Sequence, residues 1–210
     1  LSEAAETLGD AKVEAFATHD VFNQAPPYGG SNLAAGDPLL LAAVATHVSA
    51  GELKDVVAHG AEVGADAFLE VGRQANIHLP VLKTHDRHGR RLDQVEFHPA
   101  YHDLMSHSFS AGMHSALLDG GVSTQVARAA KFFLTSQAET GHTCPITMTN
   151  AAAAVITRYA NVCAELLPKM QTRTYDPRFL PMHEKTGITI GMGMTEKQGG
   201  TDLRAISSTA

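Results

Sequence analysis

The sequence predicts a mainly α fold, in which a helical domain is followed by the first strands of a β domain. Residues 18–35 hold two prolines and two glycines among isolated apolar residues, which favours an extended arm. Apolar residues then recur at three- and four-residue steps through residues 36–187. At Ile188–Thr195 the apolar period changes to two, which is typical of a strand with one buried face. The predicted units are therefore an arm at 1–35, a helical domain at 36–187 and the start of a β domain at 188–210.

Proline and glycine mark where the helices begin and end. Asp37 followed by Pro38 predicts a capped helix start, and Pro99 opens another helix later in the chain. The polar segment 83–98, with a central glycine, suits a loop or a surface hairpin. Helices are predicted at residues 39–48, 52–74, 99–119, 123–140, 145–159 and 162–170.

The composition excludes several classes of function for this chain. It has 16 basic and 22 acidic residues and no cluster of Lys and Arg, so no nucleic-acid interface is predicted within it. No apolar run approaches the ~20 residues of a membrane span. The beginning of the chain also lacks the basic and apolar regions of a secretory signal. Two isolated cysteines favour free thiols in a reducing cytoplasm. Because the chain begins without Met and stops within a possible second strand, we expect a fragment.

The segment from Gly193 to Asp202 carries the most specific functional signal. It reads Gly-Met-Thr-Glu-Lys-Gln-Gly-Gly-Thr-Asp, with Ala205 three positions further on. This run resembles the signature of the acyl-CoA dehydrogenase family at every restricted position, including the Glu, the Gly and the final Asp. It also lies where that family carries its signature, at the passage from an amino-terminal helical domain into a β domain. The chain therefore resembles the amino-terminal half of such a protein.

The resemblance extends beyond the signature and points to the AidB-like branch of the family. In the run GMGMTEKQGGTD, Lys197 and Gln198 replace the Pro that many members carry after the Glu. The similarity covers nearly the whole chain after about its first fifteen residues. Its upstream parts are HDVFNQ, DAFLEVGRQAN, RRLDQVEFHPAYH and CPITMT, at residues 19–24, 66–76, 90–102 and 144–149.

The resemblance implies an FAD site, part of which this chain supplies. A flavin ring is flat, apolar on its faces and polar along one edge, so it needs a smooth platform with hydrogen-bond donors at its rim. Gly191 and Gly193 leave one face of the predicted strand without side chains. Amides and a hydroxyl in Gly199–Thr201 suit the pyrophosphate oxygens. The cofactor-binding residues implied are Met192, Gly193, Met194, Thr195, Glu196, Lys197, Gln198, Gly199, Gly200 and Thr201.

The resemblance implies substrate contacts in this chain but no catalytic residue. Thr195 and Thr201 are expected to touch both FAD and an acyl-CoA or a related small molecule. In the family reaction a carboxylate removes the α proton while the β hydrogen leaves as hydride to the flavin. The resemblance places that carboxylate in a carboxy-terminal helical domain, so no catalytic residue is predicted in this chain. Glu196 is interpreted as structural, hydrogen bonded within its turn. The isolated chain is expected to bind FAD weakly and to leave acyl-CoA unoxidised.

Three functions remain open at this point. The first is FAD-dependent α,β-dehydrogenation of an acyl-CoA thioester by a cytoplasmic homotetramer. The second is that of an AidB-like flavoprotein in DNA alkylation protection, with little dehydrogenase activity and with nucleic acid bound only through a carboxy-terminal part outside this chain. The third is a non-enzymatic helical module that kept the fold. Bound flavin, seen as a yellow colour, would separate the first two from the third.

Two further patterns have plainer explanations. His98 and His102 have the i, i+4 spacing of metal ligands on a helix. No partner set accompanies them and Pro99 leaves His98 at a helix boundary, so a capping or solvated pair is favoured and no metal site is predicted. Cys144, before Pro145 at a helix start, has the position of an activated thiol. No His, Asn or Asp order supports a nucleophile, so a buried structural thiol is expected.

Overall fold

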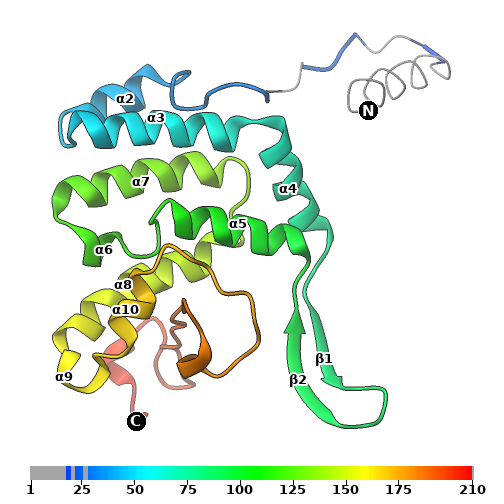
Figure 1. Ribbon diagram of the computed structural model, residues 1–210, viewed down its shortest axis with the longest axis vertical. Helices are drawn as coiled ribbons and strands as arrows, with labels where there is room; N and C mark the ends of the chain where they lie inside the picture. The colour runs from blue at the N-terminus through cyan, green and yellow to red at the C-terminus, as the bar shows by residue number, and fades with distance from the viewer. Residues whose placement is uncertain (1–17, 20–21, 26–27, 210) are drawn as a thin grey trace.

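A computed structural model describes residues 18–19, 22–25 and 28–209, which form stacked helices with a protruding hairpin (Figure 1). The predicted mainly α fold class is confirmed. Most of the arm predicted at 1–35 lies outside the described residues. The helices are α2 (Pro38–Ala45), α3 (Ala50–Gly64), α4 (Asp66–Ile77), α5 (Pro99–Ser110), α6 (Ala116–Asp119), α7 (Val122–Ser136), α8 (Thr143–Arg158), α9 (Ala160–Cys163) and α10 (Leu166–Gln171), with 3-10 turns at Met182–Glu184 and Leu203–Ala205.

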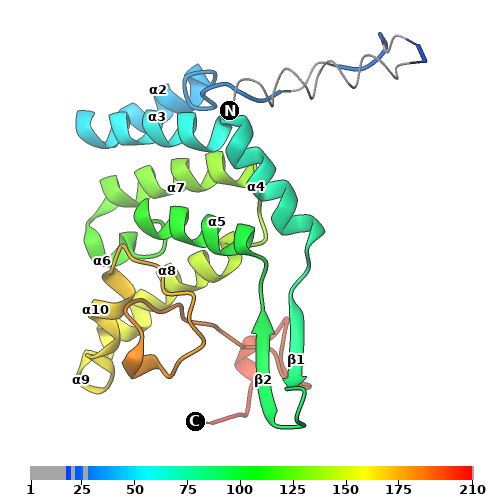
Figure 2. The ribbon, with the colours of Figure 1, turned by 45° about the vertical axis from the view of Figure 1, so that its right-hand side comes forward.

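The helices lie in layers that both ribbon views show. α2 and α3 form one outer layer, α7 and α5 lie beneath them, and α8 to α10 lie on the far side of α5 (Figures 1 and 2). α4 connects the outer layer to α5 along one side. Within the described ranges, no helix has both the length and the apolar character that crossing a membrane requires.

Side chains cap the starts of α2, α3 and α5, and the sequence predicts the first and the last of these. Asp37 Oδ1 accepts a hydrogen bond of 2.9 Å from a backbone amide in the first turn of α2. Ser49 and Glu52 form a reciprocal capping box at the start of α3. His98 Nδ1 accepts a hydrogen bond of 3.2 Å from the Ala100 amide at the start of α5, so the capping role is confirmed for His98. It is wrong for His102, which is half-buried and hydrogen bonded to Tyr175.

The single helix predicted at 52–74 is wrong, because the chain turns at Ala65 and continues as α4. Ala65 is extended, with φ −67° and ψ 140°. Gly64, just before it, packs so closely against the incoming loop that a Cβ there would lie 2.0 Å from the Ser31 carbonyl oxygen. This contact between distant parts of the chain is invisible to helical periodicity.

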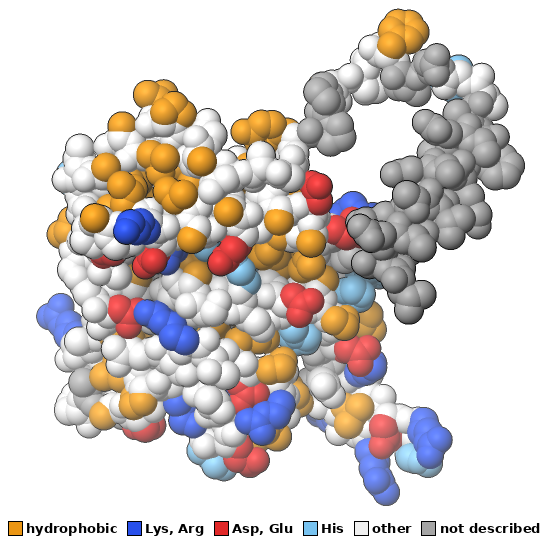
Figure 3. Space-filling model, turned by 45° about the horizontal axis from the view of Figure 1, so that its top comes forward, with side chains coloured by type: hydrophobic (Ala, Val, Ile, Leu, Met, Phe, Trp, Pro, Cys, Tyr) orange, Lys and Arg blue, Asp and Glu red, His pale blue; other side chains and the backbone are white. Residues whose placement is uncertain are grey.

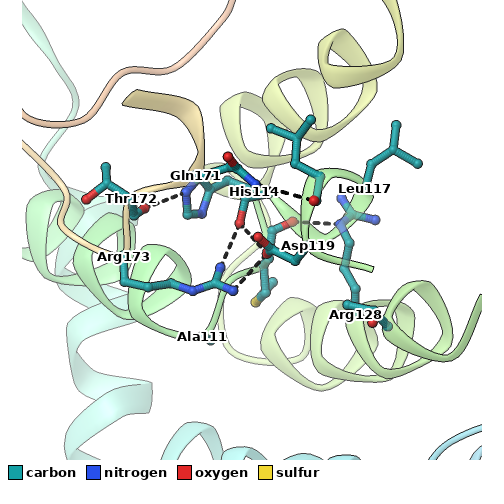
Figure 4. Close-up of polar contacts among 12 residues, drawn as sticks. Ala111, His114, Leu117, Asp119, Arg128, Gln171, Thr172 and Arg173 are labelled. Carbon is teal, nitrogen blue, oxygen red and sulfur yellow. Dashed lines mark hydrogen bonds and ion pairs between the residues drawn. The ribbon is translucent and has the colours of Figure 1, made fainter. Parts of the chain in front are cut away.

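The helix predicted at 99–119 is also interrupted, between α5 and α6. Gly112 has φ +72°, a left-handed conformation that ends α5. A Cβ on Gly112 would lie 2.1 Å from Arg173 Nη1, so the guanidinium occupies the space above this glycine. Arg173 donates to Ser115 Oγ at 2.6 Å and to Asp119 Oδ2 at 2.7 Å (Figure 4). The segment that follows α10 therefore packs against this break.

The remaining predicted elements are confirmed with shifted boundaries. α7 ends four residues before the predicted end at Thr140, and α8 begins two residues before the predicted start at Pro145. The helix predicted at 162–170 is divided into α9 and α10. The segment 83–98 forms the antiparallel hairpin of β1 (Val81–His85) and β2 (Arg91–Glu96).

The core consists of successive apolar clusters rather than one centre. The first lies between α2, α3 and α7, the second between α5 and α8, and the third joins α8 and α10 to the segment after them. Their fully buried members include Val56, Val63, Leu134, Met105, Phe109, Met113, Ile146, Ala153 and Met170. Ile188, 7% exposed, belongs to the third cluster. The helical body therefore holds the start of residues 188–202, which lead into and include the signature and are called the signature region below.

Hydrophobic side chains also gather on the outer layer of α2 and α3 (Figure 3). α2 has no charged residue, and its Leu39 is 81% exposed. A shallow groove beside it is lined by Leu40 and Ala43 of α2 and by Val126 of α7. This uncovered apolar face partly accounts for the low fraction of charged residues in the chain, 18%.

His114 joins the α5–α6 junction to the segment after α10. Its ring stacks on Phe109 with centroids 3.7 Å apart, and its Nε2–H donates to the Thr172 carbonyl at 2.9 Å (Figure 4). Burial first, and the nearby charge of Arg173 to a smaller extent, lower the pKa of His114 to about 4 against the opposing effect of the Thr172 hydrogen bond. The imidazole is therefore neutral in the folded protein at pH 7.

Replacing Gly60 with Ala is expected to lower the free energy of unfolding by about 1–3 kcal/mol, because of overpacking. A Cβ there would lie 2.6 Å from the Ala34 amide nitrogen. Gly51→Ala, in the same helix, is the control, since its Cβ meets only an ordinary contact at 3.9 Å. It should be neutral or stabilising by up to about 1 kcal/mol. Urea unfolding of both variants checks this, and equal stability would contradict the close packing of the loop on α3.

Lowering the pH from 7 to 5 is expected to destabilise the protein through His114. Its folded pKa lies below the ordinary value of 6.5, so the unfolded chain takes up a proton first and stability falls as the pH drops from about 6.5 towards 4. The loss attributable to His114 by pH 5 is about 1–2 kcal/mol. His114→Gln should show a smaller decrease between the two pH values in urea unfolding. An unchanged decrease would show that His114 does not titrate as proposed.

Candidate functional site

The signature region leaves the helical body at Ile190. The Ile188 amide donates to the Lys169 carbonyl at 3.2 Å, and the Ile190 amide donates to Thr149 Oγ1 at 3.0 Å. Ile190 packs on the same apolar cluster as the buried Ile188. These contacts with α8 and α10 fix the point from which the following residues extend.

The strand predicted at Ile188–Thr195 is not present among the described residues. A strand requires a neighbouring strand to receive its backbone hydrogen bonds, and this segment pairs with no described strand. The alternation predicts burial correctly only for its first two apolar residues. Met192 and Met194 are 54% and 49% exposed. The side chains that a second layer would bury therefore lie open.

The backbone from Gly191 to Thr195 presents a bare edge. A Cβ built on Gly191 or Gly193 meets no atom within 4 Å. The amides of these five residues make no hydrogen bond to any residue that the structure describes. Free backbone donors beside open space fit the polar edge of a flat aromatic cofactor such as a flavin.

Glu196 stabilises the turn that follows. Its amide donates to the Gly199 carbonyl at 2.8 Å, and the Gly199 amide returns a hydrogen bond of 3.2 Å. The Glu196 carboxylate accepts hydrogen bonds from the hydroxyl and the amide of Ser208 and from the Ser207 amide. These bonds, the Ser208 hydroxyl first, lower the pKa of Glu196. Hydrogen bonding within the turn is confirmed, and a carboxylate held in this way is a poor general base near neutral pH.

The two glycines of the turn are constrained by the protein itself. A Cβ on Gly199 would lie 3.0 Å from Ile206, and one on Gly200 would lie 3.0 Å from Thr195 Cγ2. The sequence interpretation attributed these glycines to close approach of a phosphate. Packing inside the turn is a second reason for them, and the two reasons do not exclude each other.

The other predicted site residues lie around the same turn. Lys197 and Thr201 are exposed, and the Gln198 side chain donates to Glu196 at 2.7 Å and to Ser207 at 2.6 Å. The segment Met192–Thr201 is thus a continuous surface loop in which Gly199 is buried.

A cleft beside this loop was missed by the sequence interpretation. It has a volume of about 320 Å³ and lies between β2, the start of α5 and the segment after α10, reaching Thr189. Its walls combine aromatic rings with two cations. The lining residues that give it this character are Phe97, Tyr101, Phe109, Tyr175, Arg178 and Lys185. The sequence did not single out these residues, because the walls are assembled from β2, α5 and the segment after α10.

Two uncharged side chains that line this cleft are hydrogen bonded to each other. Tyr175 Oη lies 3.0 Å from His102 Nδ1. Burial raises the pKa of Tyr175 and lowers that of His102, so both rings are uncharged at neutral pH. Beside them, Asp176 holds Arg178 through a contact of 2.6 Å. The cleft therefore sets aromatic rings within a largely polar lining, and Lys185 offers a cation for an acidic group of a ligand.

A second cleft, of about 340 Å³, lies on the other side of Tyr101 and is lined partly by Glu139 and His142. His142 Nδ1 lies 2.5 Å from the Glu139 carboxylate, and Nε2 lies 2.9 Å from Ser108 Oγ. Burial raises the pKa of Glu139, but hydrogen bonds from His142 and a backbone amide outweigh it and bring the pKa to about 2. Ser108 is fully buried within α5 and does not line the cleft. The trio therefore joins α5 to α8 and does not form a nucleophilic site.

Cys144 differs from its expected state. It is exposed at the start of α8, so the prediction of a buried thiol is wrong. The side chain lies on the outer face of the helix, which the position of Pro145 alone does not reveal. Cys144 and Cys163 are both free thiols, as expected.

Comparisons with known proteins agree with this fold. Residues 23–177 match the family described as the adaptive response protein AidB N-terminal domain. The putative acyl-CoA dehydrogenase AidB of Escherichia coli (strain K12) is 42% identical over 92% of this chain and 36% of its own length. The Caenorhabditis elegans ACDH-11 structure in complex with C11-CoA aligns with a TM-score of 0.67 at 24% identity, over 90% of this chain and 33% of that one. The structure of Bd2924 in its apo form aligns with a TM-score of 0.72 at 27% identity, over 89% and 37%.

The chain spans about a third of the length of these relatives. Within that span, the family match covers most of the helical domain and the identity extends through nearly all of the chain. The chain belongs to the AidB N-terminal domain family, in the AidB-like branch of the acyl-CoA dehydrogenases.

Proposed function

We propose that this chain supplies part of the FAD and acyl-CoA site of a flavoprotein that dehydrogenates an acyl-CoA thioester between its α and β carbons. The observation that carries the proposal is the bare, exposed backbone of Gly191–Thr195, at the residues that match the family signature. Membership in a family whose relative is named a putative acyl-CoA dehydrogenase supports it.

The chain's own residues have distinct roles in this proposal. Backbone amides of Met192, Gly193 and Met194, with the Thr195 hydroxyl, bind the edge of the flavin ring. When bound, the flavin accepts the hydride from the substrate. The turn of Glu196, Lys197 and Gln198 holds Gly199, Gly200 and Thr201 where their amides and hydroxyl reach the cofactor's pyrophosphate. No residue of the chain acts as catalytic base.

The aromatic cleft is the proposed path of the substrate. It adjoins the anchored start of the signature region at Ile188 and Thr189. Phe97, Tyr101 and Tyr175 offer an apolar wall for an acyl chain or for a thioester's carbon skeleton. Thr195 and Thr201, both exposed, are proposed to contact the acyl-CoA as well as the flavin.

A second function is favoured by the family model itself, whose description names an adaptive response protein. In this alternative the flavoprotein protects DNA from alkylation and dehydrogenates little. The net charge of −6 argues that nucleic acid would be bound outside this chain. In both alternatives the protein is proposed to be a homotetramer that acts in the cytoplasm. Light scattering would measure the number of subunits.

Flavin content and dye reduction test the proposal directly. We expect a form of the protein extended to the length of its relatives to bind FAD and to reduce a dye with at least one of the short, medium or branched acyl-CoAs. The 210-residue chain should bind FAD weakly and turn over at least about 10²-fold more slowly, because it lacks a base. Bound FAD without turnover would favour the adaptive-response function, and an extended form without FAD would contradict both.

Replacing Gly193 with Val is expected to weaken FAD binding at least about 10-fold in the flavin-binding form, equivalent to about 1.4 kcal/mol or more. A Cβ at this position meets no protein atom within 4 Å, so we expect the helical fold to be unchanged. Gly121→Val is the matched control, because Gly121 is equally free of neighbours and lies outside the signature. Equal FAD dissociation constants for the two variants would remove the signature backbone from the site.

A further inference from the structure

Two histidines and a carboxylate converge between α3 and α5, away from the signature loop. His59 and Glu62 lie one turn apart on α3, and His107 reaches them from the last turn of α5. One potential ligand atom from each side chain lies within 4.8 Å of the other two. His107 Nε2 is 3.0 Å from Glu62 Oε2.

The His59 ring is oriented by a neighbour that leaves one nitrogen free. His59 is 3% exposed, and its Nε2 lies 2.7 Å from Thr135 Oγ1. In the Nε2–H tautomer, which the donation from the Thr135 hydroxyl to Met113 Sδ at 3.8 Å favours, Thr135 Oγ1 accepts from His59; this is also the form that a metal at Nδ1 would select. This arrangement leaves the Nδ1 lone pair available. Burial lowers the pKa of His59 to about 3, which keeps the ring in the neutral form that binds metals.

His107 is incompletely satisfied by the protein. Its Nδ1 is buried and has no hydrogen-bond partner among the described residues. Its ring lies between His59, with centroids 4.9 Å apart, and Phe68, at 4.7 Å. The unpartnered atom is Nδ1, on the other side of the ring from the Nε2 that contacts Glu62, so Nε2 is the ligand atom that the His107–Glu62 spacing implies.

We propose that His59, Glu62 and His107 form a Zn²⁺ site that joins α3 to α5. Two imidazoles and one carboxylate are a ligand set that zinc uses when one position stays open to water. Zinc ligands at about 2.0–2.1 Å from the ion lie roughly 3.3 Å apart in a tetrahedron. The His107–Glu62 contact already has nearly that spacing. The Glu62 side chain is 62% exposed, so it can close on the ion and leaves a path for its entry.

The charges around the cluster admit a cation. Lys131 opposes it, since its charge lowers the pKa values of His59 and His107. Burial lowers the pKa of Lys131, but the carboxylates of Asp55 and Glu62 raise it, so negative charge also lies close to the cluster. Binding would replace the His107–Glu62 contact with metal–ligand bonds and would stabilise the helical domain by mass action. The site does not involve the flavin or the acyl-CoA.

Zinc titration of the metal-stripped protein tests the proposal. Competition with a chromophoric chelator should show one high-affinity Zn²⁺ per chain, and added Zn²⁺ should raise Tm. Glu62→Gln and His107→Gln should each weaken binding about 10-fold or more and abolish the rise in Tm. Glu70→Gln, on α4, and His88→Ala, in the hairpin, are exposed matched controls that should bind as the parent does.

Glu62→Gln is the decisive variant, because an exposed residue can be changed without unfolding the helix. Circular dichroism of each metal-free variant confirms that its helices are intact. Zinc bound with equal affinity by Glu62→Gln and the parent would overturn the proposal, as would the absence of any saturable site. X-ray absorption of the zinc-loaded protein should give two imidazole ligands and a carboxylate, and thiolate ligands would exclude this cluster.

Discussion

The contact of Arg173 with Gly112 fixes how the two halves of the chain meet. The guanidinium fills the space that a side chain at position 112 would need, and it binds Ser115 and Asp119 at the two ends of α6 (Figure 4). His114 adds a hydrogen bond to the Thr172 carbonyl. These contacts hold the segment after α10 against α5 and α6, and the signature region depends on that placement.

From this anchor the chain changes from packed to exposed within a few residues. Ile188 is buried between α8 and α10, whereas Gly191 to Thr195 lie open. The helical domain therefore positions a short backbone edge without covering it. The same placement explains why the aromatic cleft reaches Thr189, just before that edge, because Tyr175 and Arg178 come from the segment that Arg173 holds. One stretch of chain thus connects the helical scaffold, the backbone edge proposed for the cofactor and the cleft proposed for the substrate.

Local chemistry predicted the helix starts, because Asp37 and His98 act within their own first turns. The breaks at Ala65 and Gly112 could not be predicted, since each depends on a contact with a distant residue, Ser31 or Arg173. The alternating pattern after Ile188 indicated which side chains are apolar, but a strand also needs a partner. The signature identified the loop as a candidate site from its residue types. The cleft beside it was missed because its walls are assembled from separate segments.

Amide hydrogen exchange, measured with and without FAD in a flavin-binding form of the protein, tests most directly whether the signature backbone holds the cofactor. The amides of Gly191–Thr195 have no described protein partner, so they should exchange rapidly without FAD. We predict that FAD slows their exchange strongly and leaves the exposed hairpin of β1 and β2 unchanged. Unchanged exchange at Gly191–Thr195 in protein loaded with flavin would contradict the account.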